Sequence, residues 1–352
     1  MNQTVGKGRG MVSWLSGALI GAMLLGATPV AAAGASHAER YVALGDSISS
    51  GYGLEYETEK FTQQVANENH LSLTSLAQNG ETSGTLLERL GDPEVASAVA
   101  QADVITITVG GNDLLNALYG YLAEEYDENH TDTPTTEEEM KSALMGGDAS
   151  TLAFALGAVR GFSNSEQEQT ALSQFASNLT QVVGQIQAEN PGVWVVLANQ
   201  YNPYSYLVKE LSKFPLIGAG ARSISQAFEV GVRGLNAAIA SVGEQMGCTV
   251  VDVYAAFEDA QENPCNADLS AAMELNLDFH PNAYGHSLIA QVVTAAANTQ
   301  METGARTVSG QTTQLTQRAH GEFPPVWAML AGGAGVTALA AVAWLGTRRR
   351  GK

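Results

Sequence analysis

Short apolar runs recur along the chain, and most of them end in glycine, asparagine or aspartate. Such runs, bounded by turn-forming residues, are typical of buried strands. Five of them are RYVAL (40–44), LSLTSLA (71–77), DVITITV (103–109), VWVVLAN (193–199) and CTVVDVY (248–254). The fourth and fifth are nearly continuously apolar, as expected for strands that are covered on both faces. The pattern therefore predicts about five buried strands.

Between these runs lie segments whose apolar residues repeat at intervals of three and four. The clearest is 169–189, where the stripe consists of Leu172, Phe175, Leu179, Val182, Val183 and Ile186. Asn-Pro-Gly at 190–192 follows, and helices commonly end in this way. Two further helices are expected over 223–245 and from Pro281 to about Asn298. Strands that alternate with helices predict an α/β fold, a flavodoxin-like three-layer α/β/α arrangement with a parallel sheet of about five strands.

Residues 117–165 interrupt this alternation. They contain the acidic and polar stretch EEYDENHTDTPTTEEE and, after it, the apolar stretch LAFALGAVRGF. The acidic part is expected to be a solvated surface excursion. Because the segment directly follows the motif GGND at 110–113, it is also a candidate for a lid or for a wall of the substrate site.

The N-terminal residues 1–33 have the order of a secretory signal peptide. Lys7 and Arg9 precede an uncharged apolar stretch, and the small residues TPVAAAGA follow it. This order predicts cleavage after Ala33. The alternative is an uncleaved N-terminal anchor.

The C-terminal end predicts a transmembrane helix over 325–346. These 22 residues carry no charge, and at about 1.5 Å per residue they span about 33 Å, enough for the hydrocarbon core of a bilayer. Trp327 and Trp344 lie near the two ends, and the basic tail 347–352 follows. Basic residues beside a span stay in the cytoplasm. We therefore expect a single-pass cell-membrane protein whose domain, 34–300, is extracellular and is joined to the membrane by a polar stalk at 301–324.

Charge supports an exported soluble domain. The chain has 17 basic and 36 acidic residues, and without the six cations of the two ends the net charge is −25. Such a surface repels nucleic acid, so no nucleic-acid partner is expected. Cys248 and Cys265 both lie in the exported part, which predicts one disulfide, with two free buried thiols as the alternative. Two cysteines are too few for a structural zinc site.

Candidate chemistry follows the first and third runs. Ser47 lies in GDSISSGYG directly after the first strand, and GGND follows the third. The carboxyl ends of parallel strands meet at one rim of a sheet, so these residues are expected to lie together. A serine hydroxyl needs a base to become a nucleophile. His280 in LDFHPNAYGH is the best candidate, because Pro281 restrains its backbone and Asp278 lies beside it.

Donors for a developing oxyanion are present in the same turns. The backbone N–H of Ser47 lies at the start of a predicted helix. Gly80 in QNGETSG offers a backbone N–H without a side chain in the way, and Asn112 in GGND offers a side-chain amide. Each of these residues also has an ordinary role in turns. Their placement after three different strands favours a shared site.

The four blocks GDSISSGYG, NGETSG, GGND and DFHPN, in this order, resemble those of the SGNH hydrolase family, also called GDSL esterases and lipases. The resemblance covers about residues 40–298. It implies Ser47 as the nucleophile, Ser47, Gly80 and Asn112 as oxyanion donors and His280 as the general base. The acid of the family usually lies three residues before the histidine, where this chain has Leu277, whereas Asp278 lies two before it.

The resemblance implies an ester hydrolase that needs no cofactor or metal. Its expected substrates are the carboxylic esters of lipids, lysophospholipids or acetylated glycans. Alternatives are an acyltransferase that uses the same site, a non-catalytic glycan-binding module and a metallophosphoesterase. The last is disfavoured because only His280 and His286 are available as nearby histidine ligands. The sequence leaves the acyl chain, the leaving group and the oligomeric state open.

Overall fold

A parallel sheet lies at the centre of the part of the chain that the computed structural model describes, residues 39–129, 136–146, 148–213, 215–270 and 275–302. Within these residues its five strands have the order β2-β1-β3-β4-β5, which is the flavodoxin-like order. The strands are β1 (Arg40–Gly45), β2 (Ser72–Ser75), β3 (Val104–Thr108), β4 (Trp194–Ala198) and β5 (Thr249–Val251). The predicted α/β class with a five-stranded parallel sheet is confirmed.

Four of these five strands lie within the predicted apolar runs and β1 extends one residue beyond its run, to Gly45, but β2 is not buried. Strand β1 is buried from its second residue onward, and β3 is buried throughout. By contrast, β2 pairs only with β1 and is mostly exposed. The prediction that 71–77 is a buried strand is therefore wrong, because an edge strand has one neighbour and less cover.

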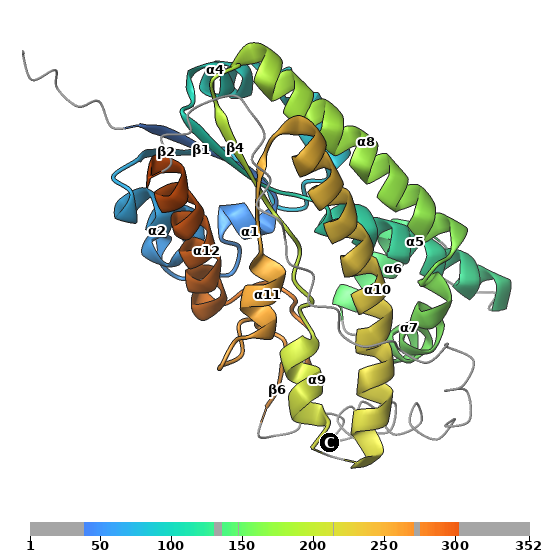
Figure 1. Ribbon diagram of the computed structural model, residues 1–352. Helices are drawn as coiled ribbons and strands as arrows, with labels where there is room; N and C mark the ends of the chain where they lie inside the picture. Colours follow the sequence, from blue (N-terminus) through green and yellow to red (C-terminus); the bar gives the residue numbers. More distant parts are fainter. Residues whose placement is uncertain (1–38, 130–135, 147, 214, 271–274, 303–352) are drawn as a thin grey trace, which may run out of the picture. The chain divides into compact units, whose positions relative to one another are not determined.

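One face of the sheet is covered by four helices. They are α3 (Ser83–Arg89), α4 (Pro93–Gln101), α8 (Glu166–Glu189) and α10 (Pro215–Met246). Helices α8 and α10 run side by side (Figure 1). Val42 and Leu44 point to this face and pack with Phe175 and Leu235 in its hydrophobic cluster.

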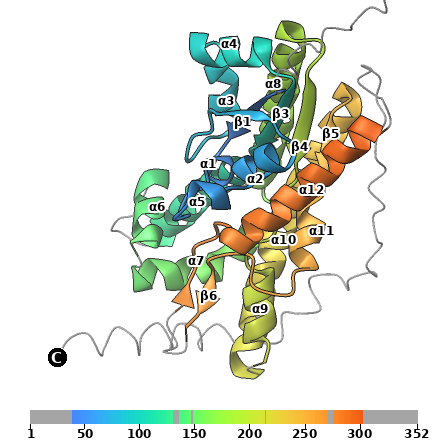
Figure 2. The same cartoon turned by 90° about the vertical axis from the view of Figure 1, so that its left-hand side faces the viewer.

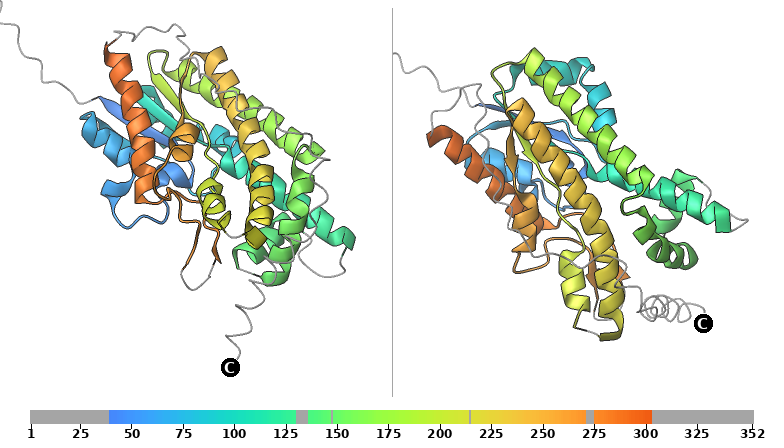
Figure 3. Two further views of the ribbon diagram at one scale, coloured as in Figure 1. Left: turned by 60° about the horizontal axis from the view of Figure 1, so that its bottom comes forward. Right: turned by 45° about the vertical axis from the view of Figure 1, so that its right-hand side comes forward.

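The other face carries α2 (Phe61–Glu68), α9 (Ser205–Leu211), α11 (Val253–Glu258) and α12 (Ala283–Glu302). Tyr41 and Ala43 point to this side and pack with Phe61 and Ile289. Side chains of β1 thus alternate between the two clusters, as the period of a strand requires. Figures 2 and 3 show α2 and α12 across the sheet from α8 and α10. The expected three-layer arrangement is therefore present in this part of the chain.

The three predicted helices exist but are longer than expected. Helix α8 begins at Glu166 because the Ser165 side chain caps it by accepting a hydrogen bond from the Glu168 N–H. Helix α10 begins at Pro215, a residue that suits the first helical position. Helix α12 begins at Ala283 and continues to Glu302, past the predicted end.

The segment 117–165 is largely helical where the structure describes it. Its first residues continue α5 (Gly111–Asn129), and α6 (Glu137–Met145) and α7 (Ala149–Phe162) follow. The three helices share a hydrophobic cluster that includes Leu122, Met140 and Val159. Tyr126 from the acidic stretch is buried in the same cluster. The described part of that stretch is helical, and apart from Tyr126 most of it is exposed, as expected of a solvated surface segment.

The predicted disulfide between Cys248 and Cys265 is wrong. Both residues are buried and both are free thiols. Cys248 belongs to the hydrophobic cluster on the α8 and α10 face, whereas Cys265 belongs to the cluster on the α12 face. The sheet separates the two clusters, so the side chains do not meet.

The predicted signal peptide (1–33), the transmembrane helix (325–346), the basic tail and nearly all of the stalk lie outside the described residues. Within the described ranges, no single helix has the length and hydropathy needed to cross a bilayer. Residues 137–145 and 150–162 pass that test only as a pair, and their axes bend by 118°.

Candidate active site

The turn after β1 places Ser47 at the rim of the sheet. Gly45 has a φ of +119°, and a Cβ there would lie 2.2 Å from the Thr108 carbonyl oxygen, so only glycine fits. Asp46 caps the short helix α1 (Ser47–Ser50) by accepting a hydrogen bond of 3.0 Å from the Ile48 N–H. As the first residue of α1, Ser47 has a backbone N–H with no acceptor inside the helix.

The structure brings Ser47, His280 and Asp278 together. His280 Nε2 lies 3.0 Å from Ser47 Oγ, although the two residues are 233 positions apart. His280 Nδ1 lies 2.6 Å from Asp278 Oδ1. When the proton of the neutral ring is on Nδ1, it is donated to the Asp278 carboxylate. Nε2 is then free to accept a hydrogen bond from the serine hydroxyl.

A tight turn lets Asp278 reach the ring from only two positions away. Its Oδ1 also accepts a hydrogen bond of 3.1 Å from the His280 backbone N–H, and its Oδ2 accepts one of 3.1 Å from Asn266 Nδ2. Burial by itself would raise the pKa of Asp278, but the hydrogen bonds from His280 outweigh it and hold that pKa below its usual value. Asp278 is therefore ionised at neutral pH.

Three tyrosines contact the loop 277–280 that carries His280. None of them was assigned a role from the sequence. Tyr201 donates a hydrogen bond of 3.1 Å to the Phe279 carbonyl, and Tyr204 donates one of 3.2 Å to the Leu277 carbonyl. The rings of Tyr52 and His280 lie 4.6 Å apart between centroids. Tyr201 and Tyr204 follow β4 at the same rim as Ser47, and this position was the only signal for them in the sequence.

A short antiparallel pair lies in the chain just before the histidine. Its strands are β6 (Asp268–Leu269) and β7 (Leu275–Asn276). Asn276 Nδ2 donates a hydrogen bond of 2.8 Å to the Asn266 carbonyl, and Asn276 Oδ1 accepts one of 3.0 Å from the Asp278 N–H. These contacts stabilise the turn that brings Asp278 within hydrogen-bond distance of Asn266.

The predicted oxyanion donors lie in three turns that are tied to one another. Asn112, at the start of α5, donates a hydrogen bond of 3.0 Å from Nδ2 to the Glu81 carbonyl, beside Gly80. Ser50 of α1 donates one of 2.5 Å to Asn79 Oδ1 in the same turn. Gly80 has a φ of +79°, and the space around its Cα is open. Asn112 Nδ2 retains a second N–H for a ligand.

A buried ion pair lies next to the Gly80 turn and supports it. The Glu81 side chain is 1% exposed and pairs with Arg89 of α3. Arg89 Nη2 also donates a hydrogen bond of 2.7 Å to the Leu76 carbonyl at the end of β2. Burial raises the pKa of Glu81, and the Arg89 contact opposes that rise. Neither residue was assigned from the sequence.

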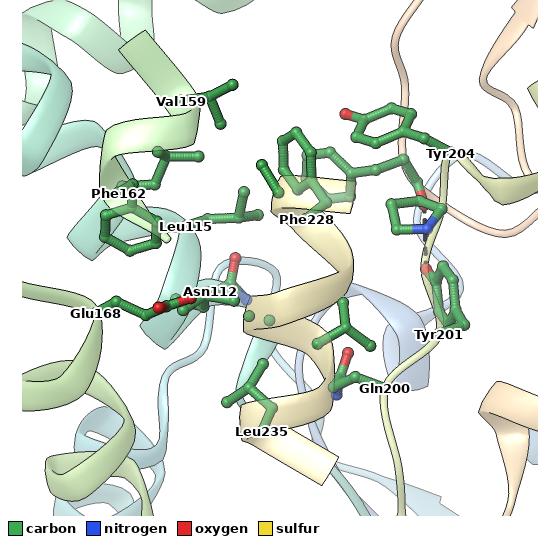
Figure 4. A pocket seen from close by; sticks show the side chains of 18 of the residues that line it. Asn112, Leu115, Val159, Phe162, Glu168, Gln200, Tyr201, Tyr204, Phe228 and Leu235 are labelled. Atoms are coloured by element: carbon green, nitrogen blue, oxygen red, sulfur yellow. Dashed lines mark hydrogen bonds between the residues drawn. The ribbon is translucent and has the colours of Figure 1, made fainter. Parts of the chain in front are cut away.

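An apolar cleft opens beside Ser47 (Figure 4). About 820 Å³ between and in front of its walls is free of protein atoms, a figure that includes space open to solvent. Its walls come from α5, α7 and α10, and the side chains include Leu115, Val159, Phe162, Phe228 and Leu235. Val159 and Phe162 belong to LAFALGAVRGF, the stretch that was a candidate for a substrate wall.

The arrangement suits nucleophilic acyl transfer. A hydroxyl, an imidazole and a carboxylate are linked in series, and Asn112 lines the same cleft as Ser47. Asp46 adds a buried carboxyl beneath the turn, where it also accepts a hydrogen bond of 2.9 Å from Thr108 Oγ1. Within the described ranges, no three His, Cys, Asp or Glu side chains are grouped so as to hold a metal ion.

Comparison with curated proteins shows two distant relatives. The spore germination lipase LipC of Bacillus licheniformis is 36% identical over 92 residues, which are 24% of this chain and 43% of LipC. The uncharacterized protein YpmR of Bacillus subtilis is 21% identical over 258 residues, 71% of this chain and 78% of YpmR. The chain thus matches less than half of the length of LipC.

Solved structures with a similar fold include two from Streptomyces. The extracellular lipase of S. rimosus superposes with a TM-score of 0.48 at 21% identity, over 74% of this chain and 99% of that one. Phospholipase A1 of S. albidoflavus has a TM-score of 0.48 at 20% identity, over 75% and 99%.

A family model provides the assignment. It matches residues 43–288, more than half of the chain, and this range contains every residue of the serine, histidine and carboxylate set described above. The chain therefore belongs to the GDSL-like lipase/acylhydrolase family.

Proposed function

We propose that this protein is a serine esterase that hydrolyses carboxylic esters through an acyl-enzyme formed on Ser47. The observation that carries the proposal is the contact of 3.0 Å between Ser47 Oγ and His280 Nε2. This distance lies within reach for direct proton transfer. Membership of an acylhydrolase family supports the same reaction class.

In the first half of the reaction, Ser47 Oγ bonds to the carbonyl carbon of the ester while its proton passes to His280 Nε2. The carbonyl oxygen becomes an oxyanion, which accepts hydrogen bonds from the Ser47 N–H, the Gly80 N–H and the Asn112 amide. The C–O bond to the alcohol then breaks, and His280 returns its proton to that alcohol. The acyl group stays on Ser47.

In the second half, water gives a proton to His280 and attacks the acyl carbon. The bond to Ser47 Oγ breaks, the serine recovers its proton, and the carboxylic acid leaves. Asp278 holds the His280 ring through Nδ1 in both halves and stabilises its charged form.

The cleft beside Ser47 supports a substrate with an apolar acyl chain. Most of its lining residues are apolar, and burying each methylene of a chain contributes about 0.8 kcal/mol. An acetyl group would leave most of the cleft unfilled. A lipid or lysophospholipid ester is therefore a better match than an acetylated glycan. The predicted signal peptide and anchor support a position at the cell surface.

The test uses the full-length protein in detergent and p-nitrophenyl esters of increasing chain length. Wild type is expected to hydrolyse them, with a maximum at a chain longer than acetyl, and to be labelled by a serine-reactive phosphonate. Ser47→Ala should lose both properties. Ser72→Ala removes an exposed hydroxyl at the start of β2, at the end of the sheet away from Ser47, and should keep both. Full esterase activity in Ser47→Ala would overturn the assignment.

The same assay separates the alternatives. An acyltransferase would give an acylated alcohol when glycerol or a sugar is added, and the free acid would decline in proportion. A non-catalytic module would neither turn over the esters nor react with the phosphonate.

A further inference from the structure

One carboxylate in the apolar cleft has an oxygen without a hydrogen-bond partner among the described residues. Glu168 lies in the first turn of α8, its side chain is among those that line the cleft, and the residue is 2% exposed. Figure 4 shows the carboxylate pointing from α8 into the cleft, toward Asn112. Its Oε2 accepts a hydrogen bond from the Asn164 N–H, whereas its buried Oε1 has no hydrogen-bond partner among the described residues.

The described surroundings of Glu168 offer no cation to the free oxygen. Among the residues that line the cleft within the described ranges there is no lysine, arginine or histidine. Gly231 of α10 faces the same oxygen, and a Cβ at that position would lie 3.2 Å from Oε1 and 2.6 Å from Leu114 Cδ2. Glycine therefore lets α10 pack closely against Leu114 and Glu168, where a side chain would collide.

A local structural role explains only one of the two carboxylate oxygens of Glu168. The turn before α8 places Asn164 at a φ of +66°, and the bond to Oε2 satisfies its N–H. The cap of α8 is made by Ser165 and uses the Glu168 backbone, not its side chain. One oxygen is enough for this role, so the structure does not explain why a second, unpartnered oxygen is kept in an apolar cleft, where its burial is costly.

We propose that Glu168 Oε1 accepts a hydrogen bond from a hydroxyl group on the acyl chain, so that esters of hydroxylated fatty acids are the preferred substrates of this cleft. This inference rests on the proposed function of Ser47. It makes Glu168 a specificity residue and not a member of the catalytic set, because it does not contact Ser47 or His280 in the structure.

A hydroxyl fits this position better than an ammonium group. An ammonium would have to leave water for a largely apolar cleft that offers it one carboxylate, and desolvation opposes that transfer. Burial raises the pKa of Glu168, which favours its neutral form. A hydroxyl can bond to the carboxyl group in either protonation state, since it is both donor and acceptor.

The experiment compares p-nitrophenyl decanoate with a series of its hydroxylated forms, each with the hydroxyl on a different carbon. For wild type, at least one positional isomer is expected to have a kcat/KM about tenfold above that of the plain decanoate, the effect of one well-placed hydrogen bond. An unchanged or lower kcat/KM for every isomer would overturn the inference without any variant.

Two variants of Glu168 and one matched control refine the result. Glu168→Leu should lose the hydroxyl preference, so that the ratio of the two kcat/KM values falls about tenfold, while plain decanoate is hydrolysed at least as well. Glu168→Gln keeps an acceptor for the Asn164 N–H and guards against a folding defect, and it should retain part of the preference. Leu115→Ala, in the wall that α5 contributes, should lower kcat/KM for both esters alike. An equal ratio in wild type and Glu168→Leu would mean that the carboxylate is structural or is satisfied by water only.

A binding measurement separates this inference from the proposed function. Calorimetry with Ser47→Ala should show tighter binding of the preferred hydroxydecanoic acid than of decanoic acid, by about tenfold. If wild type hydrolyses no ester and this difference remains, the function of Ser47 is wrong and the hydroxyl site stands. If esters are hydrolysed and the difference is absent, only the hydroxyl site is wrong.

Discussion

Asp278 holds His280 at two points, through the ring and through the backbone. Its Oδ1 lies 2.6 Å from His280 Nδ1 and 3.1 Å from the His280 backbone nitrogen. This double contact is possible because the acid is only two residues from the histidine. The Leu277 side chain packs instead against the hydrophobic cluster on the α12 face of the sheet. The short spacing therefore gives a rigid acid–histidine unit.

Asp278→Asn should lower kcat on the order of 10⁴-fold, because an asparagine amide favours the wrong tautomer of the ring. KM should change little. Asn266→Ala removes only the donor to the other carboxylate oxygen and should lower kcat less than tenfold. A loss below tenfold in Asp278→Asn would show that Ser47 and His280 act as a dyad.

Asn112→Ala should reduce kcat by 10²- to 10³-fold, about 3 to 4 kcal/mol of barrier, with little change in KM. The reason is that the second N–H of Asn112 meets the oxyanion only as it forms. Leu115→Ala, on the same helix, should instead act mainly on KM for long chains. Steady-state kinetics with a long-chain p-nitrophenyl ester distinguishes the two. A KM effect alone in Asn112→Ala would place the amide in substrate binding.

Arg89→Met should destabilise the fold by about 3 to 5 kcal/mol, because it leaves Glu81 buried and unpaired. Because the pair supports the Gly80 turn, kcat should fall as well. The double variant Glu81→Gln, Arg89→Met removes both charges and should recover much of the stability. Urea denaturation of wild type, Arg89→Met, Glu81→Gln and the double variant completes the cycle. Equal stability of Arg89→Met and wild type would show that the pair does not support the turn.

Thiol titration checks the correction to the predicted disulfide. Native protein should react with no more than a trace of a disulfide reagent, because burial raises the pKa of Cys248 to about 12 and that of Cys265 further still. After denaturation without reductant, two thiols per chain should react. The melting temperature should be the same with and without dithiothreitol. A fall in melting temperature on reduction would show that the disulfide is present and that the correction is wrong.

Asp46 provides a prediction about pH. Burial raises its pKa from 3.8 to about 7, so the folded state holds a proton that the unfolded state releases. Its contribution to stability is therefore complete below pH 3.8 and is lost as the pH rises through about 7. Asp46→Asn keeps an acceptor for the Ile48 N–H and Thr108 hydroxyl but cannot ionise.

The variant should match wild type near pH 4 and be more stable at pH 8, by up to about 4 kcal/mol. Urea denaturation across this range measures the difference between the two proteins, which cancels the titration of other groups. A constant difference from pH 4 to pH 8 would contradict a raised pKa at Asp46.

Local pattern was enough for the strands and for the turns that carry the chemistry. Buried strands are short apolar runs, and the βα turns after β1, β2 and β3 need glycine and capping residues, so GDS, NGE and GGND mark them without tertiary information. The parallel order then puts Ser47, Gly80 and Asn112 at one rim. His280 could be selected because Pro281 and Asp278 flank it.

Tertiary packing decided the features that depend on residues far apart in the chain. It set the 3.0 Å contact between Ser47 and His280, placed Cys248 and Cys265 on opposite faces of the sheet and left β2 at an exposed edge. It also brought α5, α7 and α10 together around the cleft into which Glu168 points. Periodicity reports which face of an element is apolar, but not which other element covers that face. The chemistry of the turns was therefore readable from the chain, whereas the shape of the site was set by the way the layers pack.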